Sequence, residues 1–166
     1  MIASTPSLLL GPAVHYDGIL SRAMGAAADR VGRDGVGFLA VLRAGDPRAH
    51  SAFRYALAQE FCRYVSRLGS TFRAVYVYGS TVDGRTRPSS DVDIIAWVFR
   101  KSDTVESLLL RLNHLLTQGY RALTGCQCLQ QLFDIHLVDD EDVEFGRAYG
   151  AVVRSVWTAP LCLWRR

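Results

Sequence analysis

Three aspartates stand inside apolar stretches of the chain, where an isolated charge is costly. Asp91 and Asp93 are one residue apart at the start of an apolar run, and Asp134 lies between Phe133 and Ile135. Side chains two positions apart on a β-strand point to the same face, so Asp91 and Asp93 would lie together. Buried carboxylates repel one another and resist desolvation, and therefore need a cation or a proton beside them. The pattern indicates a site for a hard cation such as Mg²⁺, which prefers oxygen ligands.

A glycine–serine turn precedes the aspartates. Gly79 and Ser80 directly follow a short apolar run that ends at Tyr78, and a polar loop separates them from Asp91. Such a turn offers backbone N–H groups and a hydroxyl at a point where a phosphate can approach the backbone closely. A phosphate cradle next to metal-binding carboxylates indicates a site for a nucleoside triphosphate with Mg²⁺.

The third aspartate completes the site if its strand lies beside the strand of Asp91 and Asp93. Two metal ions about 3.5–4 Å apart could then hold the attacking and leaving oxygens of an in-line phosphoryl displacement. In that arrangement Asp91 and Asp93 ligate the metal of the nucleotide, whereas Asp134 helps a second metal and takes the proton of the acceptor. His136 shares the face of Asp134 and is either an assisting base or a packed histidine behind the ligands.

Hydrophobic periodicity and capping residues predict the elements that position these side chains. Asp46 followed by Pro47 is typical of the start of a helix, and Gly69 closes its apolar stripe. From residue 46 onward the order helix, strand, strand, helix, strand, helix, strand indicates a single α/β or α+β domain. The predicted helices cover 16–31, 46–68, 102–123 and 142–153, and the predicted strands cover 72–78, 91–99, 132–138 and 161–164.

The spacing of these residues resembles the nucleotidyltransferase superfamily typified by DNA polymerase beta. Within it, the stretch is most similar to the small minimal nucleotidyltransferase proteins, which read Gly-Ser-Arg-Ala-Arg-Gly and then Arg-Pro-Asp-Ser-Asp-hydrophobic-Asp. The resemblance covers roughly 72–98, with a weaker continuation over 131–138, and implies a mixed sheet flanked by helices. It divides the chain into an N-terminal helical extension, 1–45, and a nucleotidyltransferase-like domain, 46–166. The corresponding places are occupied by Gly79, Ser80, Gly84, Arg87, Pro88, Ser90, Asp91 and Asp93.

Two loop positions depart from the small-family pattern, because Thr81 and Asp83 stand where that family usually has arginines. The remaining basic side chains of the loop, Arg85 and Arg87, either contact the triphosphate instead or lie in a solvated loop. An arginine fork binds phosphate oxygens in pairs. The resemblance therefore implies a nucleotide-binding role for these two arginines and for Ser90, beside Gly79 and Ser80.

The resemblance also implies the reaction. We expect Mg²⁺-dependent transfer of a nucleoside monophosphate, AMP from ATP, to a hydroxyl of a protein, an RNA or a small molecule. Asp91, Asp93 and Asp134 would be the catalytic metal ligands, for one or two Mg²⁺ ions. Two alternatives remain open at this point: a catalytically weak, antitoxin-like binding module that acts on a partner protein, and an aminoglycoside-type antibiotic adenylyltransferase. No large domain that could hold an acceptor follows the core strands. We therefore expect a partner protein or a second copy of the chain to take part in binding the acceptor.

Composition bounds these expectations. The 166 residues are 49% hydrophobic and 21% charged, which is typical of one globular domain with its own core. The net charge of +3 is too mild to indicate nucleic acid as the partner. No apolar run reaches the roughly 18 residues of a membrane span, so we expect a cytoplasmic protein without membrane contact. The four cysteines do not follow zinc-site spacing and are expected to be reduced thiols: Cys62, Cys126, Cys128 and Cys162.

Overall fold

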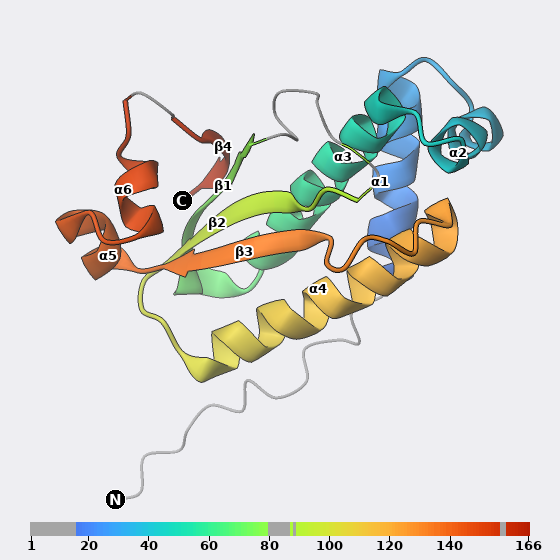
Figure 1. Ribbon diagram of the computed structural model, residues 1–166. Helices are drawn as coiled ribbons and strands as arrows, with labels where there is room; N and C mark the ends of the chain where they lie inside the picture. Colours follow the sequence, from blue (N-terminus) through green and yellow to red (C-terminus); the bar gives the residue numbers. More distant parts are fainter. Residues whose placement is uncertain (1–15, 80–86, 88, 157–158) are drawn as a thin grey trace, which may run out of the picture.

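The computed structural model describes residues 16–79, 87, 89–156 and 159–166. A four-stranded sheet in the order β3-β2-β1-β4 forms its centre (Figure 1). β1 runs antiparallel to both β2 and β4, whereas β2 and β3 run parallel, so the sheet is mixed. Helices flank this sheet, which confirms the predicted mixed α/β architecture.

Most elements begin and end close to the predicted positions, whereas the helix α2 (Gly35–Arg43) was not predicted. Their bounds are α1 Tyr16–Arg30, α2 Gly35–Arg43, α3 Pro47–Ser66, β1 Phe72–Tyr78, β2 Val92–Val98, α4 Asp103–Thr124, β3 Phe133–Val138, α5 Asp140–Phe145, α6 Tyr149–Val153 and β4 Leu161–Arg165, with a 3₁₀ turn at Gly69–Thr71.

The predicted helix starts are confirmed by their capping contacts. The Asp46 side chain accepts a hydrogen bond from the Ala49 N–H at 2.7 Å, and Pro47 occupies the first turn of α3. The Ser102 hydroxyl accepts from the Val105 N–H at 3.3 Å at the start of α4. Each cap satisfies a backbone donor that has no partner within its helix.

The single helix predicted over 142–153 is wrong. The chain forms two short helices instead, because Gly146 adopts φ +62° and ends α5, where its N–H donates back to the Asp142 carbonyl. Glycine enters this left-handed conformation at little cost, so it terminates helices. The helix α5 also starts earlier than predicted, at Asp140, with Asp139 as its cap.

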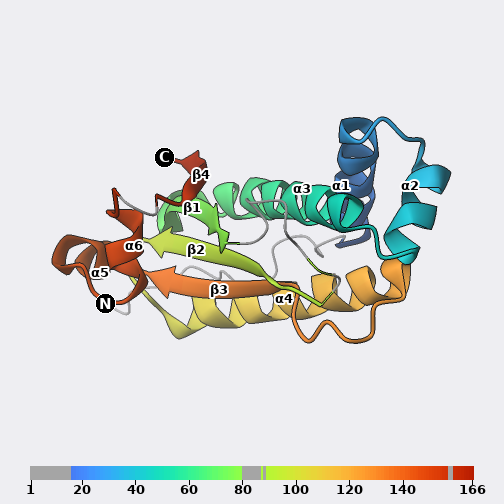
Figure 2. The ribbon, with the colours of Figure 1, turned by 45° about the horizontal axis from the view of Figure 1, so that its top comes forward.

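The two faces of the sheet are covered differently. The first face packs on α3 and α4, with α1 against these two helices, and side chains such as Val77, Ile94 and Phe133 lie in this main core. The second face carries a smaller cluster around Tyr76 and Ile95 with α5 and α6. Those two helices lie at the carboxyl ends of β2 and β3 (Figures 1 and 2). Among the described residues, the starts of β2 and β3 are therefore the less covered part of the second face.

The N-terminal helices share the main core with the sheet. Leu20 of α1 and Phe38 of α2 belong to the same buried cluster as Phe53 of α3. Gly119 of α4 lets α1 approach, because a Cβ at this position would lie 2.2 Å from Leu20 Cδ1. The boundary near residue 45 stays a prediction.

Two further expectations concern cysteines and membranes. The four cysteines form no disulfide; Cys62 is buried, and Cys126 Sγ lies 3.1 Å from Cys128 Sγ. Within the described ranges, no helix is long and apolar enough to cross a bilayer.

Candidate active site

Asp93 and Asp134 lie side by side at the starts of two parallel strands. In the β2–β3 ladder Asp93 pairs with Asp134, one position after Val92 pairs with Phe133. Val92 and Phe133 are fully buried in the main core, so the alternation of side chains places both carboxylates on the second face of the sheet. The predicted adjacency of the two strands is confirmed.

His136 joins the two carboxylates from the same strand. Three side chains each offer one ligand atom, and these atoms lie within 4.8 Å of one another: Asp93, Asp134 and His136. The Nε2 atom of His136 is 3.2 Å from Asp134 Oδ2, yet it is buried and makes no hydrogen bond. The short distance and the missing hydrogen bond are compatible, because the two atoms are close without the alignment that a hydrogen bond requires. Two carboxylates and an imidazole thus converge on one small volume.

The ring of His136 is fixed by a tyrosine that follows the break between α5 and α6. Tyr149 stacks on it with ring centroids 3.5 Å apart and planes inclined by 14°. Tyr78, at the end of β1, lies 6.3 Å from the histidine ring and 6.1 Å from the Tyr149 ring. This aromatic packing limits how the imidazole can turn within the cluster.

Gly79 brings the backbone of the predicted phosphate turn against Asp93. Its φ is +75°, and a Cβ at this position would lie 2.4 Å from Asp93 Oδ2. A side chain here would therefore be both strained and in collision with the carboxylate. The preceding residue, Tyr78, pairs with Asp93 across the β1–β2 ladder, which fixes the turn beside the acidic pair.

The electrostatics of this site disfavour the charged form of Asp93. Burial raises the pKa of Asp93, and the charges of Asp91 and Asp134 raise it further, while His136 has the opposite effect. Burial also raises the pKa of Tyr78, to which the charge of Asp93 adds. A cation between the carboxylates would remove this repulsion, so the residues fit the divalent metal that the sequence resemblance implies.

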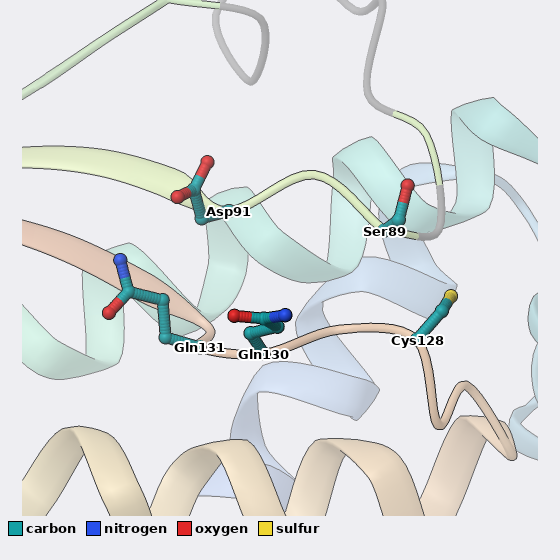
Figure 3. A pocket seen from close by; sticks show the side chains of 5 residues that line it. All are labelled: Ser89, Asp91, Cys128, Gln130 and Gln131. Carbon is teal, nitrogen blue, oxygen red and sulfur yellow. The ribbon is translucent and has the colours of Figure 1, made fainter.

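Asp91 lies just before β2 and lines a neighbouring pocket rather than the convergent cluster. Within the described part of the chain, its oxygens are not among the ligand atoms that meet within 4.8 Å. The pocket has a volume of about 510 Å³. Figure 3 shows Asp91 and Ser89 on the segment that leads into β2, facing the segment that leads into β3. The second segment contributes Cys128, Gln130 and Gln131.

The loop residues predicted to bind the nucleotide are placed in part. Arg87 and Ser90 close a turn, in which the Ser90 N–H donates to the Arg87 carbonyl at 3.0 Å and the Ser90 hydroxyl accepts from the Arg87 N–H at 3.1 Å. Arg87 itself is exposed. Ser80 and Arg85 lie outside the described residues, as do the two positions that depart from the family pattern, Thr81 and Asp83.

A buried polar network holds this turn and was not predicted from the sequence. Arg54 of α3 is fully buried and donates from Nη1 to the Arg87 carbonyl at 2.7 Å. Its Nε donates to the Tyr120 hydroxyl at 3.1 Å, and His50 Nδ1 lies 2.5 Å from the same hydroxyl. The only available signal was an arginine directly after Phe53, which belongs to the apolar stripe of the helix, and this does not reveal a partner that is 33 residues away along the chain.

Comparisons with known proteins give one structural likeness. No protein-family model and no curated protein sequence match the chain. Among solved structures it is similar to a "putative nucleotidyltransferase" from Sulfolobus solfataricus, at 18% identity over 74% of this chain and 90% of that chain. The TM-score is 0.41, and conclusions on chemistry depend on the site itself.

Proposed function

We propose that this protein is a divalent-metal-dependent nucleotidyltransferase that moves a nucleoside monophosphate, AMP from ATP, to a hydroxyl of a protein, an RNA or a small molecule. The observation that carries the proposal is the pairing of Asp93 with Asp134 in adjacent strands, directly behind the Gly79 turn. A carboxylate whose charged form is disfavoured by neighbouring carboxylates needs a cation, and a turn that starts at a glycine suits a phosphate.

The chain's own residues supply four roles in this proposal. Asp93 and Asp134 would hold Mg²⁺, with Asp91 as a further ligand from the side of the neighbouring pocket, and the bound ion would neutralise phosphate oxygens and orient them. The Gly79 turn, continued by Ser80, would receive the β- and γ-phosphates, with Arg85, Arg87 and Ser90 as further nucleotide contacts. The acceptor oxygen would attack the α-phosphorus as the bond to the β-phosphate oxygen breaks and pyrophosphate leaves. Asp134 would take the proton of the acceptor hydroxyl.

The buried network supports this use of the loop. Because Arg54 binds the Arg87 carbonyl from inside the core, it anchors the backbone at the end of the nucleotide loop close to Asp91. A backbone that is already held in place loses less conformational entropy when it binds a ligand. The pocket that Asp91 and Gln131 line offers carboxylate and amide groups. A hydroxyl-bearing acceptor could form hydrogen bonds with these groups.

Labelled ATP tests the reaction class. The protein is incubated with Mg²⁺, a lysate of the cells that naturally contain it, and ATP labelled either at the α- or at the γ-phosphate. Nucleotidyl transfer predicts stable label on an acceptor from α-labelled ATP and none from γ-labelled ATP. Asp93→Asn should lower the labelling at least about a hundredfold, the scale of losing a group that stabilises transition-state charge. Asp29→Asn, an exposed position on α1, should leave it unchanged. Label from the γ-phosphate, or equal labelling by both variants, would contradict the proposal.

A further inference from the structure

His136 occupies a position in the acidic cluster that a carboxylate-only metal site would not need. His136 lies two positions after Asp134 on β3, so both side chains project from the same face of the sheet toward Asp93. The sequence alone left its role open between an assisting base and a packed histidine. The structure adds three observations that bear on this choice.

The first observation is the unsatisfied nitrogen. His136 Nε2 is buried and makes no hydrogen bond, although it lies 3.2 Å from Asp134 Oδ2. A buried imidazole nitrogen that makes no hydrogen bond loses hydration without full compensation, even with a carboxylate oxygen 3.2 Å away. A histidine that served only packing would be expected to form that hydrogen bond. Donor atoms that are close but not aligned with one another are typical of ligands that face a common cation.

The second observation is the convergence of three ligand atoms. Atoms from Asp93, Asp134 and His136 lie within 4.8 Å of one another. Ligand atoms on opposite sides of a cation at about 2.0–2.2 Å are separated by about 4.0–4.4 Å, so side-chain adjustments of a few tenths of an ångström would bring all three atoms onto one metal ion. The third observation is the stacking of Tyr149 on the imidazole, which restrains the ring before any metal arrives.

We propose that His136 is a direct ligand of the metal at this site and that the site therefore selects Mn²⁺ over Mg²⁺. The inference depends on the proposed function, since it concerns the metal of that same site. Imidazole nitrogen binds first-row transition metals well, whereas Mg²⁺ favours oxygen ligands and retains its water. One nitrogen among carboxylate oxygens shifts the preference toward Mn²⁺, which accepts both ligand types and can still bind a triphosphate.

Electron paramagnetic resonance on the full, untagged chain with Mn²⁺ tests the ligand directly. Pulsed spectra of bound Mn²⁺ should show coupling to a coordinated ¹⁴N nucleus, and protein labelled with ¹⁵N-histidine should replace that coupling by the ¹⁵N pattern. This readout uses the wild-type protein and needs neither substrate nor activity. Bound Mn²⁺ without nitrogen coupling would overturn the proposal that His136 is a ligand, while the carboxylate site of the proposed function would stand.

Competition between Mn²⁺ and Mg²⁺ tests the selectivity. We expect wild-type protein to bind Mn²⁺ about tenfold or more tightly than Mg²⁺, and His136→Gln to reduce the affinity for Mn²⁺ at least about tenfold with little change for Mg²⁺. The matched control His114→Gln, at an exposed position on α4, should behave as wild type. Circular dichroism verifies that each variant is folded. An unchanged ratio in folded His136→Gln would overturn the selectivity, and absence of any Mn²⁺ binding by wild type would overturn both this inference and the proposed function.

Discussion

Asp93 lies directly opposite Asp134 in the parallel β2–β3 ladder, and a Cβ on Gly79 would touch Asp93 at 2.4 Å. The fold thus brings two carboxylates together and removes the side chain of the residue that faces them. The arrangement costs stability when no cation is present, because like charges share a partly buried site. We expect a protein that keeps this destabilising pair of carboxylates to use the pair for binding a cation.

The first prediction concerns Asp93→Asn in metal-free protein. Burial and the charges of Asp91 and Asp134 raise the pKa of Asp93, so the folded chain binds more protons than the unfolded chain between the two pKa values. The free energy of unfolding therefore falls as the pH rises through that window and remains lower at neutral pH. Asp93→Asn should be more stable than wild type at pH 7 in chelator, and urea unfolding measures the difference.

The same experiment at low pH supplies its control. Below both pKa values the carboxyl of Asp93 is protonated in either state, so the difference between variant and wild type should shrink toward zero. If Asp93→Asn is less stable at pH 7, or if the difference does not depend on pH, the repulsion inferred at this site is absent.

The second prediction compares two glycines with the same backbone conformation. Gly79 and Gly125 both have φ +75°, but a Cβ on Gly125 would have no atom within 4 Å, whereas one on Gly79 would collide with Asp93. Gly125→Ala should cost only the left-handed strain of roughly 1–2 kcal/mol in the free energy of unfolding. Gly79→Ala should cost more and should also weaken Mn²⁺ binding, as measured by titration. Equal effects of the two substitutions on metal binding would show that the close approach to Asp93 has no role.

The third prediction concerns the buried network under the Arg87 turn. The Tyr120 hydroxyl bonds with both Arg54 and His50, and the Tyr120 ring stacks on Phe53 at 5.3 Å. Tyr120→Phe keeps the stacking and removes the hydroxyl, so it should lower the free energy of unfolding by about 1–3 kcal/mol. Chemical denaturation measures this change, and Tyr64→Phe on the same main core serves as the comparison. A loss in Tyr120→Phe no larger than in Tyr64→Phe would indicate that the network contributes nothing to stability.

The fourth prediction has the opposite pH dependence from the first. Hydrogen bonding to Arg73 lowers the pKa of Asp140, with a smaller contribution from the Trp97 indole. A lowered pKa in the folded state gives stability that is present above the unfolded pKa and is lost as the pH falls through the folded value. Both charged side chains are 40% exposed, so Asp140→Asn should cost at most about 1 kcal/mol at pH 7. Thermal melts over a pH series from 7 downward measure this, and a loss that does not shrink as the pH falls below the unfolded pKa would contradict it.

Local signals explain which parts of the fold could be predicted. The strand Phe72–Tyr78 and the Asp46 cap were predicted at their observed positions, because short-range patterns determine both. The break at Gly146 was missed, since apolar residues continue at helical spacing beyond it and conceal the stop. Glycine near the middle of such a pattern is compatible with either outcome.

The site was predictable in its residue types but not in its detailed geometry. The apolar context of Asp93 and Asp134 indicated a shared site, provided that their two strands are neighbours in the sheet. The pairing of β2 with β3 meets this condition. That His136 lacks a hydrogen bond and stacks on Tyr149 depends on how α6 returns to the sheet, which no local pattern encodes. The burial of Arg54 likewise depends on a contact distant in the sequence.

Calorimetric titration with MgATP measures whether Asp91 and Asp93 are needed to bind a metal-bound nucleoside triphosphate. We expect the wild-type chain to bind MgATP and the Asp91→Ala, Asp93→Ala double variant, verified as folded, not to bind it. The Asp29→Asn control should bind as wild type. Equal binding by wild type and the double variant, or no binding by wild type, would contradict the assignment of this site to a metal-bound nucleoside triphosphate.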